Sequence, residues 1–171
     1  MKLNKLINPM LIIGFAVALR LLPHPANFAP IAAMALFGGA YLNRKYALTV
    51  PLVAMFISDL FLGFHASMPL VYIGFFLTGV IGLYLAKHKT VYSVVGASLL
   101  SSILFFFLTN FNYWYATALY PKTIGGLFLS YYNALPFFRN SIVGDLLYVG
   151  LFFGAYELGL RFAKRPLAAQ V

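Results

Sequence analysis

Three charged residues lie inside stretches of the sequence that are otherwise apolar: Arg20, Asp59 and Asp145. Burying one ionisable side chain in a membrane helix costs about 2.5–3.5 kcal/mol on insertion scales. Such residues either pair with one another, which would fasten helices together, or line a water-accessible cavity. Both interpretations are open here, and for Arg20 we expect an ion pair with Asp145 or Asp59.

A rim of further polar side chains favours the cavity over a purely structural ion-pair network. These side chains are amides, imidazoles, an indole and one guanidinium, and all are expected at the same level of the protein. They are His24, Asn27, His65, Asn110, Asn112, Trp114, Asn133, Arg139 and Asn140. All except Asn133 are candidate ligand-binding residues, with aromatic rings stacking, asparagines hydrogen bonding, and Arg139 or His24 contacting an anion.

Other chemistries lack the residues that they need. Cysteine is absent, so there is no disulfide and no thiol nucleophile. His24, His65 and Asp59 share no helical ligand spacing, and we therefore expect no metal site. No HExxH, GxSxG or phosphate-loop string occurs, which argues against hydrolytic or nucleotide chemistry. We expect no catalytic residues, no cofactor and no enzymatic activity.

The composition defines the solvent that the protein occupies. The chain of 171 residues is 63% hydrophobic, 18% aromatic and only 9% charged, outside the range of soluble domains. The net charge of +9 falls in short clusters between apolar runs, a pattern that does not suit a nucleic-acid partner. The sequence therefore predicts an all-α polytopic helix bundle, a single integral membrane domain over residues 1–171, with the lipid bilayer as its surroundings.

Six apolar segments are long enough to be considered as membrane helices. They cover residues 6–22, 29–42, 46–64, 69–86, 91–110 and 137–162. We take the first as an uncleaved helix; the second is short, and its Pro30 suits a first helical turn. Nine of the twelve basic residues fall on one side of this arrangement. By the positive-inside rule that side is cytoplasmic, and both termini with it.

The three remaining connections, 23–28, 63–68 and 111–136, then face outward. The string "PHPANFAP" predicts a rigid loop, after which the short second helix would point its first N–H groups into the cavity. The long connection 111–136 predicts an aromatic interfacial segment, part of which could cover the cavity.

Two local patterns have simpler interpretations. Small residues four apart, as in Ala35/Gly39 and Gly150/Gly154, predict close helix approach within the bundle or against a partner. Glu157 lies four residues before Arg161, a spacing typical of a stabilising pair on one helix face.

Four strings carry a resemblance to a known family. They are "RLLPHPANFAPIAAMALFGGAYL", "ISDLFLGFHASMPLVY", "LFFFLTNFNYW" and "PFFRNSIVGDLLYVGLFFGAYE". Together they resemble an uncharacterised bacterial family of small membrane proteins proposed to act in transport. The six-helix arrangement also resembles the substrate-binding subunits of energy-coupling-factor transporters, whose outer loops close over a vitamin. This resemblance implies a location in the bacterial cytoplasmic (inner) membrane, and a membrane scaffold and ATPase subunits as partners.

We therefore expect a solute-binding protein that works in the uptake of a small, amphipathic, vitamin-like molecule. Two alternatives stay open. One is a structural or assembly subunit of a larger membrane complex. The other is an intramembrane enzyme that acts on a lipid or isoprenoid and uses Asp59 or Asp145 with His65.

Overall fold

The computed structural model describes residues 9–65 and 67–164, and every regular element in them is a helix. The helices are α1 (Pro9–Leu21), α2 (Ile31–Tyr41), α3 (Thr49–Leu62), α4 (Met68–Leu85), α5 (Val91–Ala116) and α6 (Ile124–Lys164). The predicted all-α bundle of six helices is confirmed. The basic residues at positions 2, 5 and 165 lie outside the described residues.

Three helices are long and apolar enough to cross a membrane: Met68–Leu85, Val91–Ala116 and Ile124–Ala163. The described parts of α1, α2 and α3 have 13, 11 and 14 residues, below the roughly 20 residues that a full span needs. By length and composition, half of the six predicted spans therefore meet the requirement within the described residues.

The short helix α2 is the centre of the bundle. Every residue from Ala32 to Ala40 is buried, and α2 contacts each of the other helices. A helix that is apolar all round is suited to burial on every side. Its small residues also allow a close approach to α4, because Gly39 lies directly against Gly79 and Gly82. The spacing Ala35/Gly39 thus serves packing inside the bundle.

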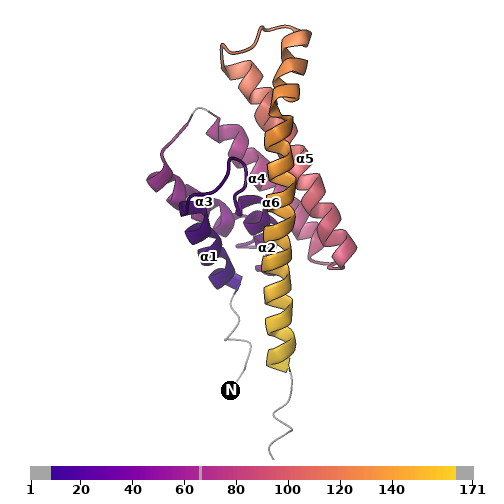
Figure 1. Ribbon diagram of the computed structural model, residues 1–171. Helices are drawn as coiled ribbons and strands as arrows, with labels where there is room; N and C mark the ends of the chain where they lie inside the picture. Colours follow the sequence, from indigo (N-terminus) through magenta and orange to yellow (C-terminus); the bar gives the residue numbers. More distant parts are fainter. Residues whose placement is uncertain (1–8, 66, 165–171) are drawn as a thin grey trace, which may run out of the picture.

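The connections alternate between the two ends of the bundle (Figure 1). We call upper the end that carries the connections after α1, α3 and α5, and lower the end that carries those after α2 and α4. The lower end holds Arg44, Lys45, Lys87, Lys89 and Arg161, all exposed. These basic residues therefore gather at one end, as the charge pattern predicts.

The connection between α5 and α6 is shorter than the sequence predicts. Helix α5 continues to Ala116 and α6 begins at Ile124, leaving residues 117–123 between them. Helix α6 has 41 residues and runs through Pro136, so its length is about 60 Å. Figure 1 shows the α5–α6 hairpin extending above the other helices.

Contacts with α5 explain why α6 begins well before Pro136, at which a helix boundary is normally expected. The Ser130 hydroxyl donates a hydrogen bond to the Asn110 carbonyl oxygen, and the Tyr131 hydroxyl donates to that of Phe107. The Phe106 ring packs against both Tyr131 and Phe138, on either side of the proline. Tertiary packing thus holds the helix together where local propensity would end it.

We expect the Gly82→Ala variant to unfold at a lower temperature than the wild-type protein. The new Cβ would meet the Leu36 carbonyl oxygen and lie 3.0 Å from the Cα of Gly39. Overpacking of this kind costs about 1–3 kcal/mol. The measurement is the thermal unfolding midpoint in mild detergent, with Gly96→Ala as control because no atom lies within 4 Å of its Cβ position. Equal midpoints for the two variants would contradict the proposed role of the α2–α4 contact.

Candidate functional site

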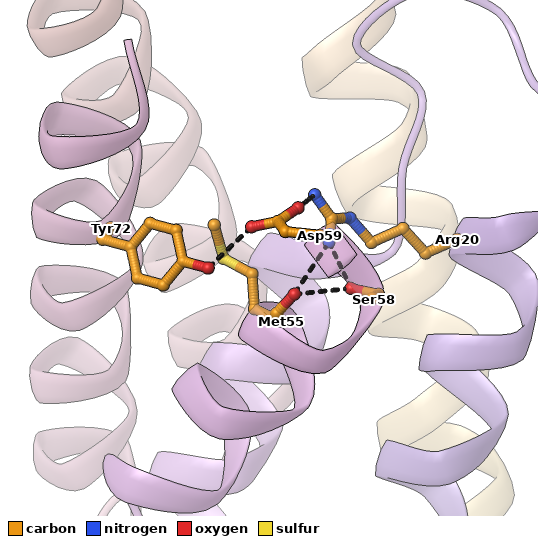
Figure 2. A network of polar contacts seen from close by, with 5 residues as sticks. All are labelled: Arg20, Met55, Ser58, Asp59 and Tyr72. Carbon is orange, nitrogen blue, oxygen red and sulfur yellow. Dashed lines mark hydrogen bonds and ion pairs between the residues drawn. The ribbon is translucent and has the colours of Figure 1, made fainter. Parts of the chain in front are cut away.

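A buried polar network joins three helices near the upper end (Figure 2). Arg20, in the last turn of α1, extends to α3, and its Nη2 lies 2.5 Å from Oδ1 of Asp59. Its Nη1 donates to the Met55 carbonyl oxygen at 3.1 Å and to the Ser58 hydroxyl. The Arg20 and Asp59 side chains are 10% and 3% exposed. The guanidinium is therefore matched in charge and held by three acceptors of one helix.

Helix α4 completes the network from the other side of Asp59. The Tyr72 hydroxyl donates a hydrogen bond to Oδ2 of Asp59 at 2.6 Å, so the carboxylate lies between Tyr72 and Arg20 (Figure 2). Of the two partners expected for Arg20, the structure places Asp59 in contact with it.

Asp145 has a different environment. It is only 7% exposed, and its Oδ2 accepts a hydrogen bond of 2.6 Å from the Ser102 hydroxyl of α5. Arg20–Asp59 is the one ion pair within 4 Å that the structure shows in the described residues. The Asp145 carboxylate therefore lies on the inner side of α6 with a hydroxyl as its partner rather than a cation.

Two adjoining cavities open at the upper end. The first has a volume of about 500 Å³ and is lined by Arg20, His24 and Asp145 together with apolar side chains. The second, of about 660 Å³, lies toward α5 and α6 and is lined by His65, Asn110 and residues of the α5–α6 hairpin. Both are bordered by the same five residues: Arg20, Asn27, Ile31, Phe75 and Phe105. The two cavities therefore adjoin each other, and together we call them the upper cavity.

The loop between α1 and α2 forms part of the wall and is fixed to α6. The Asn140 side chain donates a hydrogen bond of 3.2 Å to the Ala26 carbonyl oxygen. Phe28 packs against Gly144, where a Cβ would lie 3.1 Å from its ring. Between these two contacts Asn27 adopts a left-handed backbone conformation with φ of 58°, which asparagine tolerates better than most residues. These contacts hold Asn27 at the border of both cavities.

Part of the predicted ligand-binding set lines the upper cavity. His24 and Asn27 come from the α1–α2 loop, His65 from the α3–α4 connection and Asn110 from α5. Segments far apart in the sequence thus bring two imidazoles and two amides to one hollow. Arg20 and Asp145, predicted as members of the ion-pair network, line it as well.

The other predicted ligand-binding residues lie elsewhere. Trp114 donates from Nε1 to the Pro121 carbonyl oxygen at 2.9 Å and so closes the α5–α6 turn. Asn112 does not line the cavity, and its Nδ2 is buried without a hydrogen-bond partner in the described structure. Arg139 is exposed on α6, and Asn140 holds the α1–α2 loop. Helix periodicity explains part of the difference, since Asn110 and Asn112 are two residues apart and cannot share a face.

Several residues of the site carried no specific signal in the sequence. Phe75 and Phe105 border both cavities with their rings, 4.9 Å apart between centroids, but nothing distinguishes them from other phenylalanines of the chain. Tyr72 is similar. Ser102 could have been noticed, because Ser98, Ser101 and Ser102 form a buried polar stripe on an otherwise apolar helix.

The arrangement is suited to binding. Its walls combine aromatic rings, amides and imidazoles with one carboxylate, Asp145, that has no cationic partner. The second carboxylate of the region, Asp59, is engaged by Arg20 and Tyr72. In residues 9–65 and 67–164, no three His, Asp or Glu side chains come together in a way that could hold a metal ion.

A family model described as a family of unknown function (DUF6580) matches residues 2–167. The chain belongs to this family. Comparison with curated proteins gives no match, and neither does comparison with solved structures. The function of this DUF6580 member must therefore be argued from its own site.

We expect the Arg20→Met variant to lose most of its stability in detergent, because Asp59 would be left buried without its cation. Breaking a buried ion pair on one side costs about 3–5 kcal/mol. Adding Asp59→Asn should restore part of the loss, since the amide no longer needs a counter-charge. Thermal unfolding midpoints of the single and double variants measure this, with exposed Arg139→Met as control. An unchanged midpoint for Arg20→Met would contradict the anchoring role of the pair.

Proposed function

We propose that this DUF6580 member is a membrane-embedded solute-binding protein that works in the uptake of a small amphipathic molecule. The observation that carries the proposal is the upper cavity, a hollow with polar groups from four parts of the chain and a compensated ion pair at its border. Its two parts, about 500 and 660 Å³, are within the range of 300–1,000 Å³ usual for small-molecule sites.

The lining suggests the chemistry of the ligand. Phe75 and Phe105 offer aromatic faces, whereas Asn27, His65 and Asn110 offer hydrogen bonds. Asp59 compensates the charge of Arg20, whereas Asp145, the acidic residue that lines the first cavity, has no cationic partner among the described residues. A ligand with an apolar ring system and a hydrogen-bond donor near Asp145 suits this lining better than one that places a carboxylate there.

The orientation that we propose rests on the charge distribution. Of the exposed basic residues that the structure describes, five lie at the lower end, whereas Lys122 and Arg139 lie in the upper half. The positive-inside rule assigns the end with the excess of positive charge to the cytoplasm. The upper cavity would then open outward in a multi-pass protein of the bacterial cytoplasmic membrane. The six-helix arrangement resembles that of the substrate-binding subunits of energy-coupling-factor transporters. By analogy we propose a vitamin-like ligand, and a scaffold with ATPase subunits as partners.

The geometry favours this proposal over an intramembrane enzyme. Asp59 is occupied by Arg20 and Tyr72. Asp145 lines the first cavity, whereas His65 lines the second. No described contact joins His65 to either carboxylate as an acid–base pair would require. A structural or assembly subunit remains the alternative that the experiments below separate.

Native mass spectrometry of the protein purified in mild detergent tests whether a small molecule is retained. We expect a defined adduct that Asn110→Ala reduces at least tenfold, because Asn110 borders the cavity. Asn112→Ala is the matched control, since the same amide lies two residues away and outside the lining. A bare mass, or lipid adducts that both variants leave unchanged, would favour the structural subunit.

The two carboxylates of the region should respond differently to the same substitution. In Asp145→Asn the amide oxygen can still accept the Ser102 hydrogen bond, so we expect a thermal midpoint close to wild type and loss of the retained molecule. In Asp59→Asn the Arg20 guanidinium loses its counter-charge, so we expect a clear fall in the midpoint. If Asp145→Asn unfolds the protein as readily as Asp59→Asn does, Asp145 is a structural residue and this part of the proposal fails.

A further inference from the structure

A second hollow lies at the lower end, away from the upper cavity. It has a volume of about 420 Å³ and lies between the first turns of α5 and the C-terminal half of α6, with Tyr41 of α2 at its border. Val91, Val94 and Phe153 contribute to a largely apolar wall, and Lys89 and Arg161 contribute positive charge. We call it the lower cavity.

In the described residues, the two cations of the lower cavity have no ion-pair partner within 4 Å. Lys89 and Arg161 are exposed, and the one ion pair of the described residues lies elsewhere, at Arg20 and Asp59. Glu157, the carboxylate of this hollow, accepts a hydrogen bond of 2.6 Å from the Tyr41 hydroxyl. The predicted pairing of Glu157 with Arg161 is therefore replaced by a contact with α2. The Lys89 ammonium lies over the Tyr41 ring, with its Nζ 4.3 Å from the ring centroid. Lys89 and Arg161 thus contribute two positive charges to the hollow, against the single carboxylate of Glu157.

The shape of the lower cavity is that of a groove along α6. Gly150 and Gly154 line it, and no atom lies within 4 Å of the Cβ position of either glycine. Among the described residues no helix packs against these two glycines, and the surface of α6 is open over one turn. Their spacing creates a depression between neighbouring helices rather than a contact.

We propose that the lower cavity binds an anionic phospholipid. Its phosphate group would lie between Lys89 and Arg161, and one acyl chain would follow the groove over Gly150 and Gly154. The charge arrangement supports this occupant, because basic pockets between helices near the cytoplasmic surface are suited to anionic headgroups. A zwitterionic lipid offers the same chain without the net charge. The site is independent of the upper cavity and of the proposed uptake function.

Competition between two lipids with the same acyl chains tests the headgroup preference. The purified protein is titrated with an equal mixture of phosphatidylglycerol and phosphatidylcholine, and bound lipids are counted by native mass spectrometry. We expect one phosphatidylglycerol to be bound at least fivefold in preference. In Lys89→Gln/Arg161→Gln this preference should disappear, whereas Arg44→Gln/Lys45→Gln, which removes the same charge from exposed residues of the α2–α3 connection, should retain it.

A substitution that keeps every charge tests the groove. Gly154→Leu places a side chain into the open space and should reduce the bound phosphatidylglycerol at least fivefold, with no loss of the thermal midpoint. Gly96→Leu is the control, because its Cβ position is equally open and it does not line the lower cavity. Equal binding of both lipids by the wild type would overturn the proposal. So would equal loss in the Arg44/Lys45 control, or unchanged binding in Gly154→Leu.

Discussion

The buried ion pair between Arg20 and Asp59 is the interaction on which the upper half of the structure depends. It fastens the end of α1 to α3, and through the Tyr72 hydroxyl it also reaches α4. An arginine in this position is tolerable only because its charge is matched and its other N–H groups find the Met55 carbonyl and Ser58 hydroxyl oxygens. The pair also affects the cavity that Arg20 borders, because Arg20 is engaged by Asp59 and Asp145 is left with a hydroxyl as its partner.

The three acidic residues of the chain have the same kind of hydrogen-bond partner. The three carboxylates all accept a hydrogen bond from a hydroxyl on another helix: Asp59 from Tyr72, Asp145 from Ser102 and Glu157 from Tyr41. In an apolar surrounding these hydroxyls stabilise the carboxylate and fix the neighbouring helix at the same time. Only Asp59 also has a cation within 4 Å in the described residues. Asp59, which has the cation, is the structural carboxylate, whereas Asp145 and Glu157 line cavities.

The sequence was sufficient for the broad arrangement and for the residues whose placement follows from charge. The number of helices follows from the apolar segments, and a partner for Arg20 is expected from the cost of burying its charge. Of the predicted ion-pair network, the structure shows the contact of Arg20 with Asp59. Asp145 instead accepts a hydrogen bond from Ser102. The directions in which the polar side chains point could not be predicted, because the ends of the predicted helices were uncertain. Because α5 extends to Ala116, Asn112 lies on a helix and does not line the upper cavity. Trp114 lies in the last turns of the same helix and contacts the α5–α6 connection. The path of α6 through Pro136 depends on contacts with Phe106 and Phe107, which only the folded chain brings together.

Small residues four apart occur both at a helix–helix contact and at an open surface of the protein. Their spacing in the sequence does not show which of the two will form. Gly39 and Gly82 lie so close that α2 and α4 meet backbone to backbone, and this contact keeps the short α2 at the centre. Gly150 and Gly154 share the small-residue pattern, yet the space beside them is open. A glycine pair at this spacing gives close helix contact only where a neighbouring helix also has small residues at the contact. Helix α4 provides Gly79 and Gly82 against α2, whereas Val91, Val94 and Val95 of α5 line the lower cavity. No small residue of a described helix lies against Gly150 and Gly154, and the space beside them stays open.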